Sequence, residues 1–402
     1  MQNSSHINSK IRLGTLPPIA EKLESVDLNR DFRAVKRIVV KIGTSVLTKA
    51  DGRLDKKYMD SIARQINELT KTEKQIIIVS SGAIGSGIKE LKLKTMPRDI
   101  PTRQGAAAIG QSILIETWRS VFRKYNLKVA QLLLTYEAFS NRRTYLNLRN
   151  SMNILAKCGA IPIINENDPI SVHEIESTFG DNDKLSALVA AKVDAELLVL
   201  LTDVNGLYNK NPKHKDAELI PEITEISPEI ESIGGEAGSW RTKGGMKTKI
   251  EAAKIAMESK CNVIIANAWE KRILTRIIKG EALGTLFRAS KTGYTNKDRW
   301  IRFSKSHGTI IIDKGAKYAL QKGGSLLPSG ITQLEGKFSP GDIVLLIHEE
   351  QEIAKGIVDY SSEELERIKG KSSDQIEKIL GYKNYDSIIR RENMVLSQKS
   401  SS

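Results

Sequence analysis

The chain has 402 residues, which is long enough for two or three domains, and its 40% hydrophobic content is enough to build a core. Aromatic residues make up only 5%, which argues against a base-stacking nucleic-acid surface, and no apolar run approaches the roughly 18 residues of a membrane span. The formal charge of +14 suits a polyanionic partner and is concentrated before residue 297, because residues 297–402 hold 17 basic and 15 acidic side chains.

Residues 1–36 are polar and show no periodic pattern, so we predict a disordered N-terminal extension. Acidic residues are absent before Glu21, as in organelle transit segments, but only Lys10 and Arg12 supply the basic charge that such segments carry. The two cysteines, Cys158 and Cys261, are too few for a disulfide framework and lie in apolar surroundings. We therefore expect buried free thiols and a cytoplasmic location.

From residue 37 onward, apolar strand-like runs alternate with helix-like patterns. Strands are predicted at residues 37–42, 76–81, 128–135, 160–165, 196–203 and 262–267, and helices at 54–69, 105–125, 141–158, from 185 onward and at 246–259. Such alternation is typical of a parallel sheet covered on both faces. We therefore predict an α/β three-layer sandwich with a mainly parallel central sheet over residues 37–290.

The pattern changes after residue 287 to short apolar runs separated by glycine and proline turns. This pattern predicts a small, mostly-β domain with a C-terminal tail over residues 298–392.

The first strand ends in a segment that could meet a phosphate. Lys41 supplies a positive charge, and Gly43 would allow close approach of the backbone. Taken alone, Lys41 could also be an ordinary exposed lysine. After the second strand, residues 81–87 read as a glycine-rich loop, which is either an anion site before a helix or a flexible turn. The only Gly-Lys-Ser triplet, at Gly370, is not a phosphate loop, because Leu365 stands where the motif needs glycine.

Two clusters of amides and carboxylates flank apolar stretches, at residues 165–169 (NENDP) and 180–183 (GDND). They could bind an amino group and order lysines, or they could be turns that these side chains stabilise locally. Residues 171–179 between them would then form a mobile cover. A third polar pair, Thr202 and Asp203, follows the strand at 196–203. Because the carboxyl ends of parallel strands meet at one edge, we expect these groups to gather there.

The last candidate segment is residues 241–249, with the sequence RTKGGMKTK. Gly244 and Gly245 open the predicted helix, and Lys247 and Lys249 lie in its first turn. A glycine pair before a helix N-terminus, together with lysines, is typical of a phosphate site. The alternative is an ordinary exposed helix end, which first-turn lysines disfavour because they oppose the helix dipole.

Six segments, in this order, resemble the amino-acid kinase family: VKIGTSVL, VSSGAIGSG, INENDP, GDNDKLSALVA, LLTDVNGLY and GGMKTK. The resemblance covers about residues 36–287, and the C-terminal module resembles a PUA domain. The combination is similar to the members that phosphorylate the side chain of glutamate. One departure is Lys243, which replaces a small residue of the family's Thr-Gly-Gly-Met core or marks an insertion there.

The resemblance implies ATP-dependent phosphorylation of the L-glutamate γ-carboxylate to γ-glutamyl 5-phosphate and ADP, the first step of proline synthesis. It implies Mg²⁺ held mainly through the nucleotide phosphates, with no protein metal site. The implied catalytic residues are Lys41, Lys249 and Asp183. The implied substrate-binding residues are Ser81, Gly82, Ala83, Asp168 and Asn182. The implied nucleotide-binding residues are Lys41, Gly43, Thr202, Asp203, Lys243, Gly244, Gly245, Met246, Lys247, Thr248 and Lys249.

The resemblance also implies feedback inhibition by proline, a homo-oligomer (tetramer or dimer) and a functional link to glutamate-5-semialdehyde dehydrogenase. Two alternatives stay open on the residues alone. One is a sister kinase acting on another acid such as acetylglutamate, which the PUA-like module disfavours. The other is RNA binding by that module as the main function, which the nearly neutral charge of residues 297–402 disfavours.

Overall fold

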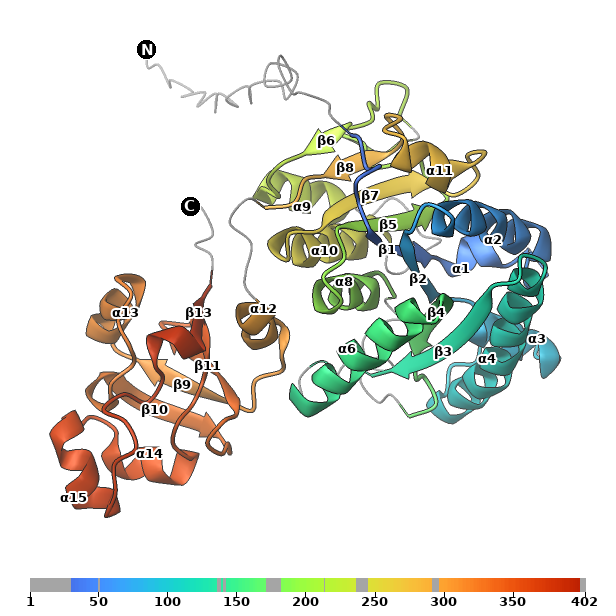
Figure 1. Ribbon diagram of the computed structural model, residues 1–402. Coiled ribbons are helices and arrows are strands. Elements are labelled where there is room, and N and C mark those ends of the chain that lie inside the picture. Colours follow the sequence, from blue (N-terminus) through green and yellow to red (C-terminus); the bar gives the residue numbers. More distant parts are fainter. Residues whose placement is uncertain are drawn as a thin grey trace, which may run out of the picture.

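A computed structural model describes residues 30–49, 51–135, 139, 142–170, 182–212, 214–235, 245–290 and 296–397. Figure 1 shows a larger α/β body and a smaller body built around a second sheet, with helix α12 (Asn296–Phe303) between them. The predicted fold class, an α/β sandwich followed by a small mostly-β domain, is confirmed.

Within the described residues, the larger sheet has eight strands. Their spatial order is β3 (Lys128–Leu134), β4 (Ala160–Glu166), β2 (Gln75–Ser80), β1 (Arg37–Ile42), β5 (Leu197–Thr202), β7 (Asn262–Asn267), β8 (Thr285–Phe287) and β6 (Glu222–Ile223). Adjacent strands from β3 to β7 are parallel, and β8 pairs with β7 in the antiparallel direction. The carboxyl ends of β4, β2, β1 and β5 therefore lie side by side at one edge of the sheet.

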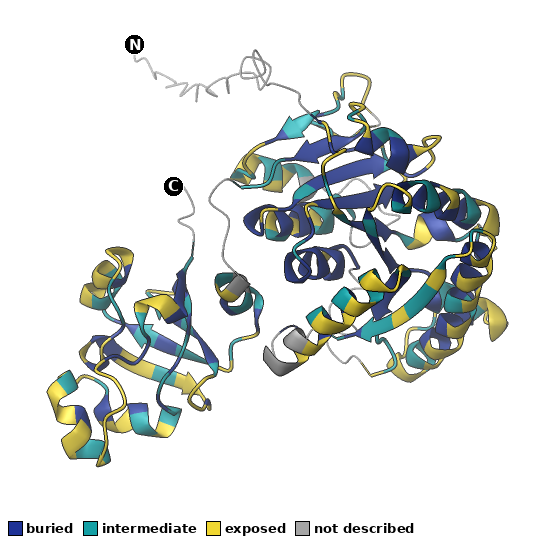
Figure 2. Cartoon of the chain, viewed as in Figure 1, coloured by how far each residue is buried: buried dark blue, intermediate teal, exposed yellow. Residues whose placement is uncertain are grey.

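Helices cover both faces of this sheet, because alternate side chains of each strand point to opposite faces. Ile38, Val40 and Ile42 of β1 belong to one core, and Val39 belongs to the other. The first core is closed by α2 (Lys56–Thr70), α4 (Ile100–Arg123) and α11 (Ile273–Ile278). The second is closed by α6 (Arg142–Lys157), α8 (Asn182–Lys192), α9 (Pro228–Gly235) and α10 (Gly245–Glu258). Figure 2 shows the resulting buried centre and exposed outer helix faces.

Residues 30–36 are ordered parts of the larger domain, so the prediction of disorder up to residue 36 is wrong for them. Phe32 is buried in the first core, and the guanidinium of the buried Arg30 donates to the backbone carbonyl of Pro221. Lys74 Nζ donates to the carbonyls of Arg33 at 2.7 Å and Val35 at 2.6 Å. A polar sequence without periodicity gave no sign of these contacts. Residues 1–29 lie outside the described residues.

The glycine-rich segment at residues 81–87 is not a loop, because helix α3 (Ala83–Glu90) begins only three residues after β2. Gly82 has φ +103°, a left-handed conformation that favours glycine. Gly87 instead serves packing: a Cβ there would lie 1.8 Å from the carbonyl oxygen of Ala106 in α4. Likewise, a Cβ at Gly110 would lie 1.7 Å from the carbonyl oxygen of Ala83. Glycine therefore lets the backbones of α3 and α4 touch. This contact fixes the start of α3 at Ala83, directly after Ser81 and Gly82.

The C-terminal domain has a five-stranded sheet in the order β10 (Ile331–Gly336), β9 (Gly308–Ile312), β11 (Ile343–His348), β12 (Gln351–Ile357) and β13 (Met394–Leu396). Its sheet thus extends past the predicted limit at residue 392. Residues 314–321, which read as strand and turn, form helix α13 (Lys314–Gln321), because Asp313 caps it by accepting from Ala316 N at 2.7 Å. The remaining helices are α1 (Thr44–Leu47), α14 (Ser362–Ile368), α15 (Ile376–Leu380), η2 (Pro328–Gly330), η3 (Ser373–Gln375) and η4 (Arg391–Asn393).

Helix α12 joins the two domains through polar contacts. Arg302 Nε lies 3.5 Å from Glu258 Oε2 at the end of α10, and its Nη1 lies 3.7 Å from Glu352 Oε1 on β12. Lys355 Nζ, also on β12, donates to the carbonyl of Ser304 at 3.1 Å. A lysine at the last carbonyls of a helix is favourable, since it satisfies groups that lack partners within the helix.

Cys261 is buried as predicted, but Cys158 is exposed, because α6 ends in solvent just before it. Within the part of the chain that the structure describes, no helix combines the length and the apolar character needed to cross a membrane.

The contact between α3 and α4 yields a stability prediction. Gly110→Ala should lower the free energy of unfolding by about 1–3 kcal/mol or more, because the new methyl group overlaps the carbonyl of Ala83. Gly105→Ala is the matched control in the same helix: nothing lies within 4 Å of its Cβ position, so it should stabilise by about 0.5–1 kcal/mol. Chemical denaturation of both variants measures this, and equal stability would contradict the packing role.

Candidate active site

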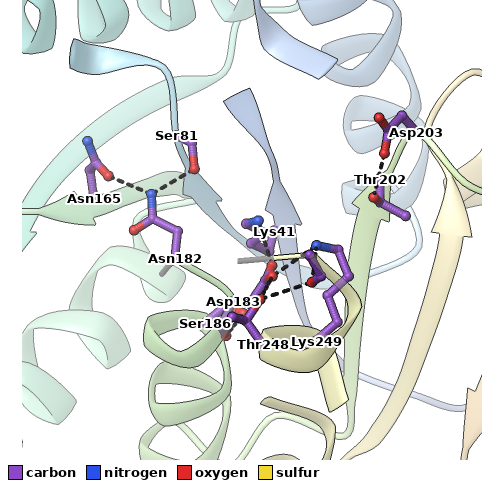
Figure 3. A network of polar contacts seen from close by, with 11 residues as sticks. Lys41, Ser81, Asn165, Asn182, Asp183, Ser186, Thr202, Asp203, Thr248 and Lys249 are labelled. Atoms are coloured by element: carbon purple, nitrogen blue, oxygen red, sulfur yellow. Dashed lines mark hydrogen bonds and ion pairs between the residues drawn. The ribbon is translucent and has the colours of Figure 1, made fainter. Parts of the chain in front are cut away.

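The predicted site segments do converge at the carboxyl edge of the larger sheet. Lys41 is the penultimate residue of β1, and Ser81 follows β2 directly. Asn165 lies near the end of β4, and Thr202 ends β5. These strands are adjacent in the order β4-β2-β1-β5. Figure 3 shows Ser81 and Asn165 on one side, the lysines in the middle, and Thr202 with Asp203 on the other side.

At the centre of the site, Asp183 binds two lysines from different elements. Asp183 Oδ1 lies 2.5 Å from Lys41 Nζ of β1, and Oδ2 lies 3.0 Å from Lys249 Nζ of α10. Thr248 Oγ1 donates to the same Oδ2 at 2.9 Å. The side chains of Lys41, Lys249 and Asp183 are only 9%, 12% and 3% exposed. The exposed-lysine interpretation of Lys41 is therefore wrong.

The local sequence explains how Asp183 reaches this position. Helix α8 begins at Asn182, earlier than predicted, which places Asp183 in the first turn. A carboxylate there is favoured by the helix dipole. Asn182 and Asp183 are accordingly helical residues and not part of a loop turn. Burial alone would raise the pKa of Asp183, but Lys41 and Lys249 outweigh it and hold the pKa well below its usual range. The three groups together carry one net positive charge at neutral pH, which suits an anionic ligand.

A chain of buried amides lies beside the ion pairs. Asn182 Nδ2 donates to Ser81 Oγ at 2.8 Å and to Asn165 Oδ1 at 3.0 Å. Asn165 Nδ2 in turn donates to Gln111 Oε1 of α4 at 2.9 Å. All four residues are buried. The sequence predicted a polar cluster at residues 165–169 but did not assign Asn165 to the site. Gln111 was not predicted, because a glutamine inside a helix carries no distinguishing pattern.

Asp168 lies close to a second carboxylate. Burial, with Glu166 as the next contribution, raises the pKa of Asp168 to about 7, and the positive charge of Arg103 opposes the shift. A cavity of about 870 Å³ opens here, and Gln111, Glu166 and Asp168 are among its lining residues. It lies beside the amide chain, while Asp183 and its lysines are not in its lining. Two acids next to an open volume, with Glu166 buried and Asp168 half-buried, can bind a cationic group.

The predicted nucleotide residues lie in two places. Thr202 Oγ1 donates to Asp203 Oδ1 at 3.1 Å at the end of β5, and the backbone carbonyl of Thr202 accepts from Ala268 N at 2.7 Å. Gly245 begins α10, with Met246, Thr248 and Lys249 half-buried and Lys247 exposed. A Cβ at Gly43 would lie 3.6 Å from Lys41 Nζ, so the protein's own atoms do not require glycine there.

Lys243 and Gly244, and the cover predicted at residues 171–179, lie outside the described residues. Within the described ranges, no group of three or more His, Cys, Asp or Glu side chains could hold a metal ion.

Comparison with known proteins adds the following. The model of the amino acid kinase family matches residues 36–267, and that of the PUA domain matches residues 308–380. Glutamate 5-kinase from Methanococcoides burtonii is 54% identical over 90% of this chain and 96% of its own length. Glutamate 5-kinase from Methanosarcina acetivorans is 50% identical over 92% of this chain and 98% of its own.

Among solved structures, T. acidophilum isopentenyl phosphate kinase overlaps 63% of this chain and 100% of its own, with 18% identity and a TM-score of 0.46.

The ion pairs of Asp183 yield a second prediction. Asp183→Asn should lower the free energy of unfolding by about 3–5 kcal/mol at pH 7, because two buried lysines lose their counter-charge. Asp216→Asn is the control, since that aspartate also pairs with a lysine, Lys210, but is 68% exposed and should matter little. Urea denaturation at pH 7 measures both. A loss no larger for Asp183→Asn than for the control would contradict the structural role.

Proposed function

Because the chain belongs to the amino acid kinase family and to its glutamate 5-kinase group, we propose that it transfers the γ-phosphoryl group of ATP to the γ-carboxylate of L-glutamate. The observation that carries this proposal is the buried cluster in which Asp183 holds Lys41 and Lys249 together at the sheet edge. An excess of positive charge fixed in a water-poor site is what a transferring phosphoryl group requires.

The chemistry needs no general base. A glutamate side chain has a reference pKa of about 4.3, so the nucleophilic carboxylate is already ionised at pH 7. One of its oxygens forms a bond to phosphorus while the bond from phosphorus to the β–γ bridging oxygen breaks, giving γ-glutamyl phosphate and ADP without proton transfer. The protein's task is to orient two anions in line and to neutralise the charge that develops.

Lys41 and Lys249 would perform the neutralisation, and Asp183 would position them. Lys41 is fixed by β1 and Lys249 by the first turn of α10, so the two ammonium groups approach the carboxylate from different elements. Mg²⁺ bound to the ATP phosphates would supply additional positive charge. Thr202, Asp203 and residues 243–249 would bind the nucleotide, with Gly43 permitting close approach of a phosphate.

Ser81, Gly82, Ala83, Asn182 and Asp168 would bind glutamate. Asp168 and the acceptor oxygen of Asn182 suit the α-ammonium group, whereas the backbone at Gly82 and Ala83, at the start of α3, can donate to a carboxylate. This assignment divides the edge into an acceptor site near β4 and a phosphoryl site near β1. In Figure 3, Ser81 and Asn182 accordingly lie to one side of the lysines.

The remaining expectations rest on the resemblance and belong to the same proposal: a place in proline synthesis, inhibition by proline, a cytoplasmic homo-oligomer and delivery of the labile product to glutamate-5-semialdehyde dehydrogenase. The test of the activity itself is ADP release with Mg-ATP and a panel of L-glutamate, N-acetylglutamate, aspartate and UMP, with hydroxylamine to trap an acyl phosphate. Glutamate-dependent ADP together with γ-glutamyl hydroxamate is expected. Turnover of another acceptor alone would refute the substrate.

The lysines give the third prediction. Lys41→Ala and Lys249→Ala should each lower kcat by at least about 100-fold, because each removes one preorganised positive charge from the phosphoryl site. Lys254→Ala provides the control in helix α10, where the side chain pairs with Glu231 at 2.7 Å on the surface. Steady-state kinetics with saturating ATP and glutamate measure the effect. Near-normal turnover in either site variant would remove that lysine from the mechanism.

Asp168 gives the fourth prediction. With a pKa of about 7, its carboxyl group is ionised above that pH and protonated below it. Only the ionised form attracts an ammonium group, so kcat/KM for glutamate should fall about tenfold per pH unit below 7. In Asp168→Asn, kcat/KM for glutamate should stay low at every pH, and its further fall below pH 7 should disappear. A pH profile of the variant that keeps the same limb would show that another group titrates.

A further inference from the structure

The amide chain beside the phosphoryl site has a defined direction. Both hydrogens of Asn182 Nδ2 are used, one by Ser81 Oγ at 2.8 Å and one by Asn165 Oδ1 at 3.0 Å. Asn165 can accept from Asn182 because its own Nδ2 points the other way and donates to Gln111 Oε1 at 2.9 Å. The orientation of each amide thus determines whether the next amide turns its oxygen or its NH₂ group toward it.

The two ends of this chain have unused hydrogen-bonding groups. Asn182 Oδ1 is a buried acceptor, and Gln111 Nε2 is a buried donor, and neither has a hydrogen-bond partner among the described residues. Leaving such groups without a partner is costly, and buried polar atoms in native proteins are nearly always paired. Two unpaired groups at opposite ends of one network therefore indicate positions where a ligand or water completes it.

The acceptor at Asn182 has a direct consequence for specificity. An oxygen with no hydrogen can bind an ammonium group but cannot bind a carboxylate. If the hydrogen bonds of the amide chain ran in the opposite direction, Asn182 would present its NH₂ group and would repel an ammonium group instead. The direction is set at the far end, where Gln111 lines the same cavity as Glu166 and Asp168. The carboxyl groups of Glu166 and Asp168 favour the orientation in which Gln111 Oε1 faces Asn165 and the NH₂ group faces away from it. Glu116, Lys56 and Arg119 also line the cavity.

From this geometry we infer that Gln111 is a specificity-determining positioning residue: through Asn165 it holds Asn182 with its oxygen toward the substrate, and so selects an acceptor that carries an α-ammonium group. The inference rests on the proposed function and deepens it. Gln111 need not touch the substrate, since it acts through Asn165. Its neighbour Gly110 packs directly on the carbonyl of Ala83, which fixes the backbone of α4 at this point.

The test compares kcat/KM for L-glutamate with that for glutarate, which lacks the ammonium group, in the full-length protein. Gln111→Met removes the acceptor for Asn165, so the hydrogen bonds of the amide chain are free to reverse their direction. It should lower the glutamate-to-glutarate ratio by roughly 10- to 100-fold, the usual worth of a hydrogen bond to a charged group. The KM for ATP should not change. Gln111→Glu keeps an acceptor toward Asn165 and should retain the ratio within a few-fold.

Gln131→Met is the matched control, because Gln131 lines the same cavity from β3 but has no place in the amide chain. It should leave both substrates unaffected. If Gln111→Met fails to fold, Gln111→Lys takes its place, since a lysine can only donate and would turn Asn165 round, with the same expected loss.

An unchanged ratio in a folded Gln111→Met or Gln111→Lys variant would overturn the inference, even if kcat fell. A loss of the ratio in Gln111→Glu as large as in Gln111→Met would also overturn it, because the role would then be steric. If the unaltered protein turns over neither glutamate nor glutarate, the proposed function fails and this inference fails with it. Normal glutamate turnover with unaltered discrimination removes only the role of Gln111.

Discussion

The architecture of the site depends on one buried carboxylate, Asp183, and the two lysines that it binds. Taking three charges out of water is costly, and the cost is offset only if their geometry is fixed by surrounding structure. Three separate elements meet that requirement: β1 carries Lys41, the first turn of α8 carries Asp183, and the first turn of α10 carries Lys249. Helix α8 is buried along almost its whole length, which holds the carboxylate rigidly. The buried cluster of Asp183, Lys41 and Lys249 is thus a product of tertiary packing.

The same packing links the site to the rest of the molecule. The close contact of α3 with α4 holds Ser81 and Gln111 at the two ends of the amide chain that runs through Asn182 and Asn165. At the opposite end, α10 finishes at Glu258, which pairs with Arg302 of the linking helix α12. Since α12 is capped by Lys355 of the C-terminal sheet, the helix that carries Lys249 is anchored on the second domain.

The sequence predicted the parts of the fold that follow from local pattern. Apolar runs flanked by turns identified β1, β2, β4, β5 and β7, and their parallel arrangement placed the site at one edge. The prediction was wrong where tertiary contacts decide the outcome. The glycine-rich residues 81–87 read as a loop, but residues 83–87 lie in helix α3, where Gly87 allows α3 to touch α4. Gln111 had no sequence signal, because its hydrogen bond with Asn165 forms only in the folded protein. Lys41 was recognised as a candidate, but its burial depends on a partner 142 positions away in sequence.

The most direct test of this account is a crystal structure of the protein with Mg-ADP, L-glutamate and aluminium fluoride, which imitates the transferring phosphoryl group. The account predicts that fluoride ligands lie within about 2.7–3.2 Å of both Lys41 Nζ and Lys249 Nζ, with Asp183 still bound to both lysines. The glutamate γ-carboxylate should lie in line on the far side of the aluminium from ADP. A bound mimic that contacts neither lysine, or only one, would contradict the central claim.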